Sequence, residues 1–369
     1  MTRLRLAIVG VGDVAQRDYL PEARRLSGIA ELAVVCSRRE DRARSVAERY
    51  GVPRWTTDYR EAIESDVDAV VNLTPLDVHH EINRAALERG RHVYTEKPVA
   101  ASAGEARELR DLAARRGLVF VCAPSVLLFP QVRYVRELLA AGRLGVIRSA
   151  RAQANGGVPP WPGYASDPTP FFSAAGGPLV DMAVYPLHAL TGLLGPVSKV
   201  AALARRTRGS FVIDDGPLRG TVVPVDCEDH WQLVADLPDC VASVEATFAT
   251  AESAAPECEL RSDAGAVAFS LLDVAEPVRV LEPGTDGWTD VFVTHERSSG
   301  PDHILGVIHM IECIAEASGQ PLLTSADHAI HILDVIEAAR RAAASGEPVA
   351  VDPGTAAALP VAATTAGAR

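Results

Sequence analysis

Short apolar segments alternate with longer, more polar segments over the first third of the chain. The apolar segments predict buried β-strands at residues 4–9, 32–36, 69–73, 92–94 and 118–122. The intervening segments predict helices at residues 14–27, 39–50, 78–89 and 103–116. Because strands that alternate with helices form parallel βαβ units, we expect an α/β fold in which residues 1–122 form a doubly wound parallel sheet.

This rhythm changes after residue 122. A helix is predicted at residues 130–141, and strand-like segments then follow at residues 147–154, 197–204, 230–236, 241–248 and 267–271. Two late helices are predicted at residues 304–317 and 326–344. Runs of strands with few helices indicate an α+β domain on a mostly antiparallel open sheet, which we place at residues 123–350. Residues 351–369, rich in Ala, Thr, Pro and Gly, are expected to form a loose tail.

Composition and charge narrow the class of protein. A chain of 369 residues with 48% hydrophobic and 23% charged residues fits a globular protein of two domains. The net charge of −12 disfavours nucleic acid and anionic membranes as partners. The sequence contains no leader-like segment and no apolar run long enough to span a membrane. The six cysteines form no C-x-x-C pair or Cys/His cluster, so we expect reduced thiols, no metal site and a cytoplasmic location.

A glycine motif follows the first predicted strand. Gly10, Gly12, Asp13, Val14 and Ala15 lie in a segment that fits G-x-G-x-x-A. In a dinucleotide site the first glycine makes the tight turn, and the second lets the pyrophosphate approach the backbone at a helix N-terminus. We therefore predict an NAD(P)-binding Rossmann domain, with a purely structural turn as the alternative.

The end of the second predicted strand bears on the choice of cofactor. NAD-selective sites usually place an acidic residue here, whereas this chain has Ser37, Arg38 and Arg39. A hydroxyl and guanidinium groups suit the 2′-phosphate of NADP, so we expect NADP(H) to be preferred over NAD(H). The alternative is that the two arginines simply begin an exposed helix.

Further polar residues follow the third and fourth predicted strands. Thr74 and Pro75 end the third strand, with His79 shortly after them, and Glu96 and Lys97 follow the fourth. A lysine at the carboxyl end of a parallel strand points into the crevice where ligands bind. His79 lines the cofactor cleft or, alternatively, caps its helix.

These motifs, together with Glu96-Lys97-Pro98 and a later Gly176-Gly177 pair, resemble the glucose-fructose oxidoreductase/inositol dehydrogenase (Gfo/Idh/MocA) family. The resemblance implies an oxidoreductase that moves a hydride between nicotinamide and a sugar-like carbinol, with Glu96 contacting the cofactor. It also implies a cis bond between Lys97 and Pro98, and homodimers or homotetramers paired through the antiparallel sheet.

The segment after the glycine pair departs from the usual family pattern. Tyr185 stands where the family usually has a histidine, and His188 stands where it usually has a second aspartate. A tyrosine here resembles the branch that contains glucose-fructose oxidoreductase and dimeric dihydrodiol dehydrogenase, which mostly use NADP. This agrees with the interpretation of Ser37 and Arg38.

Carbinol oxidation needs a group that accepts the hydroxyl proton, and reduction needs the same group as an acid. A phenol titrates near pH 10, and an ammonium within about 4–6 Å favours its phenolate. We therefore expect Tyr185 to carry the proton, Lys97 to polarise the substrate oxygen and tune Tyr185, and Asp181 to orient the substrate or Lys97. Lys97 as the immediate base stays open. Because residues four apart share a helix face, Asp181 and Tyr185 also fit a helix cap and a packed aromatic.

Candidate substrate contacts lie in a Pro-rich loop before the glycine pair. Trp161, Tyr164 and Phe172 are suited to stacking on a sugar ring, or else they form a cluster that pins the loop. His188 is a further candidate, with a core or supporting position as the alternative. The leading hypothesis is a dehydrogenase or reductase of sugars, cyclitols or sugar derivatives. The rivals are a dihydrodiol or other non-sugar carbonyl reductase, an enzyme with transient hydride transfer, and a non-enzymatic ligand sensor.

Overall fold

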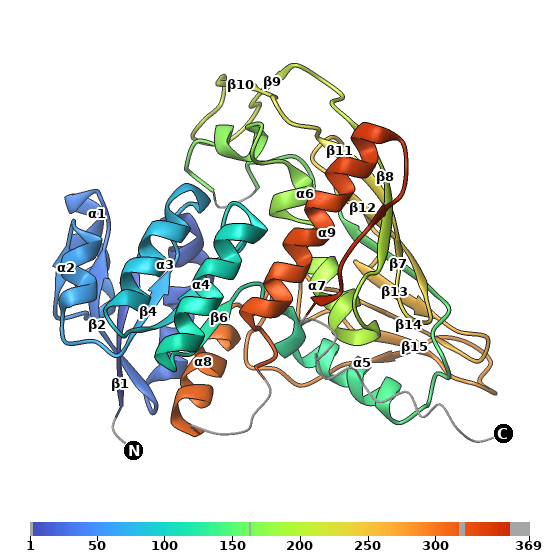
Figure 1. Cartoon of the computed structure of the whole chain (residues 1–369), viewed down its shortest axis with the longest axis horizontal. Coiled ribbons are helices and arrows are strands. Elements are labelled where there is room, and N and C mark those ends of the chain that lie inside the picture. The colour runs from blue at the N-terminus through green and yellow to red at the C-terminus, as the bar shows by residue number, and fades with distance from the viewer. Residues whose placement is uncertain (1–2, 162–163, 317–321, 355–369) are drawn as a thin grey trace. The chain divides into compact units, whose positions relative to one another are not determined.

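The computed structural model describes residues 3–161, 164–316 and 322–354 (Figure 1). Its contacts divide the chain into two units, Met1–Ser125 with Asp302–Ile330 and Val126–Pro301 with His331–Arg369. The segment Asp302–Ile330, which we placed in the second domain from the sequence, thus belongs to the first unit. Most of the expected loose tail, residues 355–369, lies outside the described residues.

The first unit contains a six-stranded, wholly parallel sheet in the order β3-β2-β1-β4-β5-β6. Its strands are β1 (Leu4–Val9), β2 (Ala30–Cys36), β3 (Trp55–Thr56), β4 (Ala69–Asn72), β5 (His92–Thr95) and β6 (Phe120–Cys122). The doubly wound sheet is confirmed, and all five predicted strands are present. The two-residue strand β3 was not predicted because it is short and only partly buried. The strand order reverses between β1 and β4, which is where ligands bind in such sheets.

Helices α1 (Glu40–Tyr50), α2 (Tyr59–Glu64), α3 (His79–Glu88), α4 (Ala103–Arg116) and α8 (Ile304–Glu316) belong to the first unit. The segment after the glycine motif is helical, but it is not the regular α-helix that we predicted. It forms a π-helical turn, Ala15–Tyr19, followed by a 3-10 helix, Leu20–Leu26. Pro21 explains the difference, because proline lacks an amide hydrogen and its ring clashes with the preceding turn of an α-helix.

The second unit is built on a nine-stranded sheet in the order β16-β15-β14-β13-β7-β12-β11-β8-β17. Every neighbouring pair is antiparallel except β7 and β12, so the predicted mostly antiparallel sheet is confirmed. Its strands are β7 (Ser149–Ala154), β8 (Lys199–Arg205), β11 (His230–Asp236), β12 (Val241–Thr247), β13 (Cys258–Arg261), β14 (Ala266–Phe269), β15 (Val278–Leu281), β16 (Thr289–Val291) and β17 (Val349–Ala350). A separate hairpin pairs β9 (Ser210–Val212) with β10 (Val222–Pro224).

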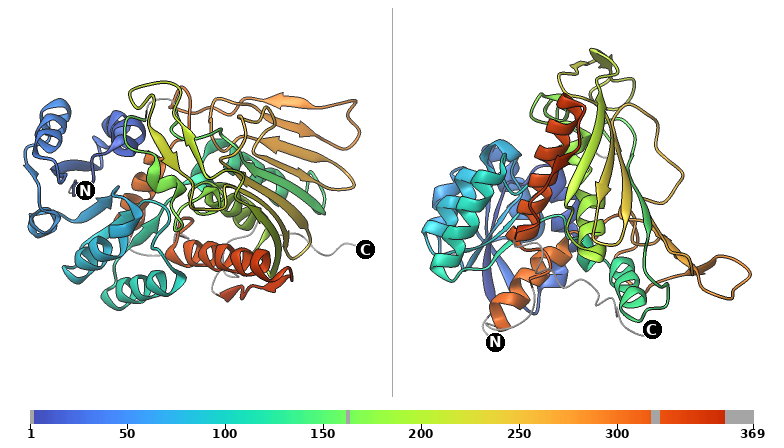
Figure 2. Two further views of the ribbon diagram at one scale, coloured as in Figure 1. Left: turned by 90° about the horizontal axis from the view of Figure 1, so that it is seen from above. Right: turned by 45° about the vertical axis from the view of Figure 1, so that its right-hand side comes forward.

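Helices α5 (Pro130–Ala140), α6 (Pro178–Asp181) and α7 (Val184–Leu194) lie in the second unit, and α9 (Ala326–Ser345) begins in the first and ends in the second. Figure 2 shows α7 and α9 on one face of the large sheet. The residues of α7 are buried from Val184 to Leu193, because the helix packs against β7. The opposite face of the sheet exposes apolar side chains that include Leu203, Val234 and Val241. In the part of the chain that the structure describes, no helix combines the length and apolar character needed to cross a membrane.

Candidate active site

The two motif glycines differ in what the fold requires of them. Gly10 has a φ of +92°, and a Cβ there would lie 2.7 Å from the carbonyl group of Leu73, which follows the neighbouring strand β4. A Cβ on Gly12 would meet only the Arg42 guanidinium, at 3.9 Å. The fold therefore requires the first glycine and not the second. The open space at Gly12, where the helical turn containing Asp13 and Val14 begins, fits a dinucleotide pyrophosphate.

The predicted cofactor arginines have different surroundings. Arg39 is exposed and forms an ion pair of 2.6 Å with Asp41. Arg38 is exposed beside the half-buried Ser37, and it forms no ion pair with any described residue. Arg42, which the sequence interpretation missed, lies in the first turn of α1 with its guanidinium over the glycine turn. Its position three residues after Arg39, one helical turn further on, was the available signal.

The carboxyl ends of β4 and β5 are tied together by a buried amide network. Asn72 donates to Asn83 of α3 over 2.8 Å, and Asn83 donates to the Thr95 hydroxyl over 3.0 Å. The Thr74 hydroxyl donates to Asn72 over 2.6 Å. The sequence interpretation missed Asn72 and Asn83, although a polar residue at the end of an otherwise apolar strand was the available signal. The network fixes the strand ends from which the predicted site residues extend.

His79 links the two loops that follow these strands. Its ring is buried, with Nδ1 and Nε2 each 2.7 Å from a carbonyl oxygen, that of Pro98 and that of Thr74 respectively. Burial lowers the pKa of His79, while the contacts with these carbonyls oppose that shift. Pro75 lies within the loop that the ring holds, and the bond between Lys97 and Pro98 is cis, as expected.

Glu96 and Lys97 follow β5 directly. The Glu96 side chain is 7% exposed, and its Oε2 accepts a hydrogen bond of 2.9 Å from the Lys97 backbone nitrogen. Its Oε1 accepts a hydrogen bond of 2.6 Å from the Tyr19 hydroxyl. Tyr19, which the sequence interpretation also missed, lies 2.8 Å from the Tyr94 hydroxyl and stacks on His303. A buried carboxylate therefore lies next to the predicted catalytic lysine.

In the second unit, the glycine pair shapes the entrance to α6. A Cβ on Gly176 would lie 2.6 Å from the carbonyl oxygen of Pro170, and Gly177 has a φ of +88°. Asp181 ends α6, and Tyr185 lies in the first turn of α7. The two residues lie on separate helices, because the chain leaves the helical conformation between α6 and α7; the alternative in which they share one helix face therefore does not apply.

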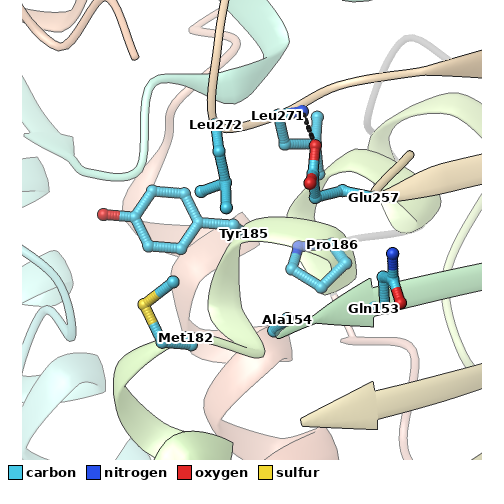
Figure 3. Close-up of a pocket in the computed structure, with 8 residues that line it drawn as sticks. All are labelled: Gln153, Ala154, Met182, Tyr185, Pro186, Glu257, Leu271 and Leu272. Atoms are coloured by element: carbon cyan, nitrogen blue, oxygen red, sulfur yellow. Dashed lines mark hydrogen bonds between the residues drawn. The ribbon is translucent and has the colours of Figure 1, made fainter. Parts of the chain in front are cut away.

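Tyr185 forms part of the wall of a small, closely packed cavity within the second unit. The cavity is lined by Gln153, Ala154, Met182, Tyr185, Pro186, Glu257, Leu271 and Leu272. Figure 3 shows the Tyr185 ring between Met182 and Leu272, with its hydroxyl directed away from Glu257. The side chain is 9% exposed. The apolar contacts therefore orient the ring while its polar end faces away from this cavity.

The predicted substrate residues of the Pro-rich loop divide into two kinds. Trp161 and Tyr164 are half-buried and contact each other edge to face at 5.6 Å between ring centroids. Phe172 is completely buried, and its ring packs against Phe211 at 4.9 Å and Phe248 at 5.5 Å. Phe172 offers no free ring face to a ligand, so the structure corrects its predicted stacking role to one of packing.

His188 lies inside α7 and is buried. Its Nδ1 is 2.7 Å from the carbonyl oxygen of Val184, which is the partner that a protonated Nδ1 requires. Burial lowers the pKa of His188 to about 4, so the imidazole is neutral at pH 7. This environment suits a supporting position more than direct contact with substrate. Lys97 lies in the first unit and Tyr185 in the second, and their convergence stays a prediction.

Comparisons with known proteins agree with both units. Residues 4–123 match the description "Oxidoreductase family, NAD-binding Rossmann fold", and residues 132–268 match the GFO/IDH/MocA C-terminal domain. A dTDP-3,4-didehydro-2,6-dideoxy-alpha-D-glucose 3-reductase of Actinomadura kijaniata is 34% identical over 219 residues, covering 58% of this chain and 63% of that protein. D-glucoside 3-dehydrogenase of Escherichia coli (strain K12) is 32% identical over 195 residues, covering 52% and 54%. The matches thus span less than two thirds of these relatives.

Solved structures resemble the whole fold. Levoglucosan dehydrogenase in complex with NADH and L-sorbose superposes with a TM-score of 0.82 at 21% identity, covering 95% of this chain and 99% of that one. An oxidoreductase domain protein from Kribbella flavida gives a TM-score of 0.81 at 23% identity, covering 95% and 100%. At this level of identity, the likeness establishes the fold alone.

Proposed function

We propose a reaction for this chain, which belongs to the Gfo/Idh/MocA oxidoreductase family. It transfers a hydride between NAD(P) and the carbinol or ketone carbon of a sugar, cyclitol or sugar derivative. The observation that carries this proposal is the open glycine turn at Gly12, which the fold itself does not require. The sugar-directed names of the two curated relatives support the substrate class.

Proton transfer is assigned to Tyr185 and Lys97. In the oxidative direction the hydride leaves the substrate carbon, and the hydroxyl proton passes to the ionised Tyr185 oxygen, which becomes the phenol; reduction reverses both transfers. When bound, the nicotinamide accepts or supplies the hydride. Lys97 polarises the substrate oxygen, and Asp181 orients the substrate or Lys97. The packing of the Tyr185 ring between Met182 and Leu272 supports this assignment, because a proton carrier must be held in position.

A substrate panel combined with two substitutions tests this function. NADPH and NADH turnover is measured over sugars, keto-sugars, cyclitols and dihydrodiols. Tyr185→Phe and Lys97→Met should each lower kcat by about 100-fold or more, the usual size of a general acid–base contribution. Tyr134→Phe on α5 is the matched control. Full turnover by Tyr185→Phe would remove the tyrosine from the mechanism, and turnover of dihydrodiols alone would replace the sugar class.

NADP(H) is the proposed cofactor preference. Ser37, Arg38 and Arg42 supply a hydroxyl and two guanidinium groups without ion-pair partners among the described residues, at the adenosine side of the sheet. Arg38→Ala should weaken NADPH binding by about 10-fold and leave NADH binding within about 2-fold, because only NADP carries the 2′-phosphate. Arg39→Ala is the control, since Arg39 is paired with Asp41. Equal weakening of both cofactors would contradict the preference.

The outer face of the large sheet is proposed to pair subunits into a homodimer or homotetramer. Leu203 is 75% exposed on this face, and Val234 and Val241 are about half exposed. Leu203→Glu should shift the mass measured by light scattering towards the monomer. Leu203→Ala is the matched control. A wild-type protein that is monomeric at micromolar concentration would refute this proposal.

A further inference from the structure

A chain of buried hydroxyl groups ends on the Glu96 carboxylate. The Tyr94 hydroxyl lies 2.8 Å from the Tyr19 hydroxyl, which in turn lies 2.6 Å from Glu96 Oε1. At the far end, the Ser125 hydroxyl lies 3.3 Å from that of Tyr94. Tyr19 is 3% exposed, and Tyr94 and Ser125 are completely buried. This chain of hydroxyl groups lies entirely within the first unit.

The hydrogens of this chain have a defined direction. An ionised carboxylate only accepts hydrogen bonds, so Tyr19 donates to Glu96. The Tyr19 oxygen then accepts from Tyr94, and both phenolic hydrogens point towards Glu96. Burial, followed by the proximity of Glu96, raises the pKa of Tyr19 well above its usual value, so this phenol keeps its proton. Aligned hydroxyl dipoles of this kind favour a negative charge at the end of the chain.

Two backbone features hold the hydroxyl chain in place. The π-helical turn Ala15–Tyr19 ends at Tyr19. Gly306 of α8 allows close approach from the other side, because a Cβ there would lie 2.5 Å from the Tyr94 ring and would clash with the Ser125 hydroxyl. The backbone of α8 therefore packs directly on the distal half of the chain and excludes water from it.

Glu96 follows β5, on the opposite side of the switch point between β1 and β4 from strand β2. Dinucleotides bind across the carboxyl edge of such sheets, so a cofactor with its adenosine beside β2 would place its nicotinamide on the side of Glu96. The nicotinamide ring is positively charged in the oxidised cofactor and neutral in the reduced one. A negative charge that is buried there acts in a low effective dielectric and therefore discriminates between the two forms.

We propose that Tyr19, supported by Tyr94, is a positioning residue that holds the Glu96 charge at the nicotinamide end and thereby favours the oxidised cofactor over the reduced one. This inference rests on the proposed NAD(P)-dependent function. Lys97 and Arg17 are the neighbouring cations and Asp18 is a further acid, and all of them act electrostatically on the same buried ring, that of His303. The hydroxyl chain differs from these charges because its phenolic hydrogens point at the Glu96 carboxylate and stabilise its negative charge.

The test compares dissociation constants for the oxidised and reduced cofactor, measured by calorimetry and by nicotinamide fluorescence without substrate. Tyr19→Phe keeps the ring that stacks on His303 and removes only the hydroxyl. The ratio of the oxidised to the reduced dissociation constant should rise by about 5- to 10-fold, less than the full effect of a lost hydrogen bond to a charged group, because only part of that effect distinguishes the two cofactor forms. Tyr94→Phe, one hydroxyl further away, should raise the ratio by only about 2-fold.

A double-mutant cycle places the effect at Glu96. Glu96→Gln should raise the ratio at least as much as Tyr19→Phe, and adding Tyr19→Phe to it should change the ratio no further. Equal weakening of both cofactor forms by Tyr19→Phe would make the tyrosine purely structural and overturn the inference. If Tyr19→Phe does not fold, an unchanged ratio in Glu96→Gln and Tyr94→Phe overturns it instead. Failure of the wild-type protein to bind either form would refute the proposed function itself.

Discussion

Alanine substitutions at the two glycines of the cofactor turn should have separate effects, one on the stability of the fold and the other on cofactor binding. Gly10→Ala places a methyl group 2.7 Å from backbone atoms of Leu73 and Thr74, at a φ of +92° that side chains disfavour. Overpacking and an unfavourable backbone conformation each cost about 1–3 kcal/mol, so we expect a loss of about 2–6 kcal/mol in the free energy of unfolding.

Gly12→Ala should give the opposite result. The added methyl group meets only the Arg42 guanidinium at 3.9 Å, an ordinary contact, and the φ of Gly12 is not in the left-handed region. The free energy of unfolding should therefore change by less than about 0.5 kcal/mol. Cofactor binding should weaken by about 10- to 100-fold, because the methyl group occupies the space through which a pyrophosphate approaches the backbone.

Urea unfolding without ligand and calorimetric titration with NADPH measure the two effects separately. Reduced binding by Gly12→Ala at unchanged stability supports a dinucleotide site. Unchanged NADPH binding by a folded Gly12→Ala protein would refute the interpretation of the turn. Wild-type stability in Gly10→Ala would show that the close approach between this turn and Leu73 is not required for the fold.

Three further predictions concern the rest of the site. The pKa of His188 is lowered to about 4 by burial against an unfolded value of about 6.5, so the unfolded state binds more protons as pH falls through this window. Stability, measured by urea unfolding, should be full above about pH 6.5 and fall by about 3 kcal/mol towards pH 4, and His188→Asn should reduce that loss. Phe172→Ala should destabilise the protein by about 3–5 kcal/mol, whereas Trp161→Ala should cost less stability and raise KM. Asn72→Ala, which leaves Asn83 without its donor, should cost about 1–3 kcal/mol by the same assay, and a loss below 0.5 kcal/mol would contradict the network.

The fold followed closely from local sequence patterns. The strand at Leu4–Val9 and the helix at Ala103–Arg116 were predicted with their observed bounds, because both are strongly patterned. The π-helical turn was not foreseen, since its form depends on Pro21 within an otherwise helical segment. The return of α8 to the first unit depends on packing between distant parts of the chain, which a local pattern does not encode.

The site residues that belong to short sequence motifs could be predicted from the sequence. The glycine turn and Glu96-Lys97-Pro98 follow strands whose ends are visible in the sequence. Tyr19 was missed because its role depends on Glu96, which is 77 positions away in the sequence. Asn72 and Arg42 carried local signals, but those signals do not identify their partners, Asn83 and the turn at Gly12. Phe172 was misassigned because an aromatic residue in a Pro-rich loop has the same local pattern whether its ring is free or buried.

The discontinuity of the first unit constrains how this chain is synthesised and engineered. Ile304, Val307, Met310 and Ile311 of α8 pack into the same core as the parallel sheet. The backbone nitrogen of Cys122 donates to the carbonyl oxygen of Thr324, so the edge strand β6, which pairs with β5 on one side, is contacted on its other side only by a late part of the chain. On a ribosome, the nucleotide-binding half cannot complete its core until almost the whole polypeptide has emerged. A truncation after residue 125 should therefore yield an aggregation-prone fragment. Domain exchange with a relative requires three junctions, after residues 125, 301 and 330, so that Asp302–Ile330 stays with the first unit.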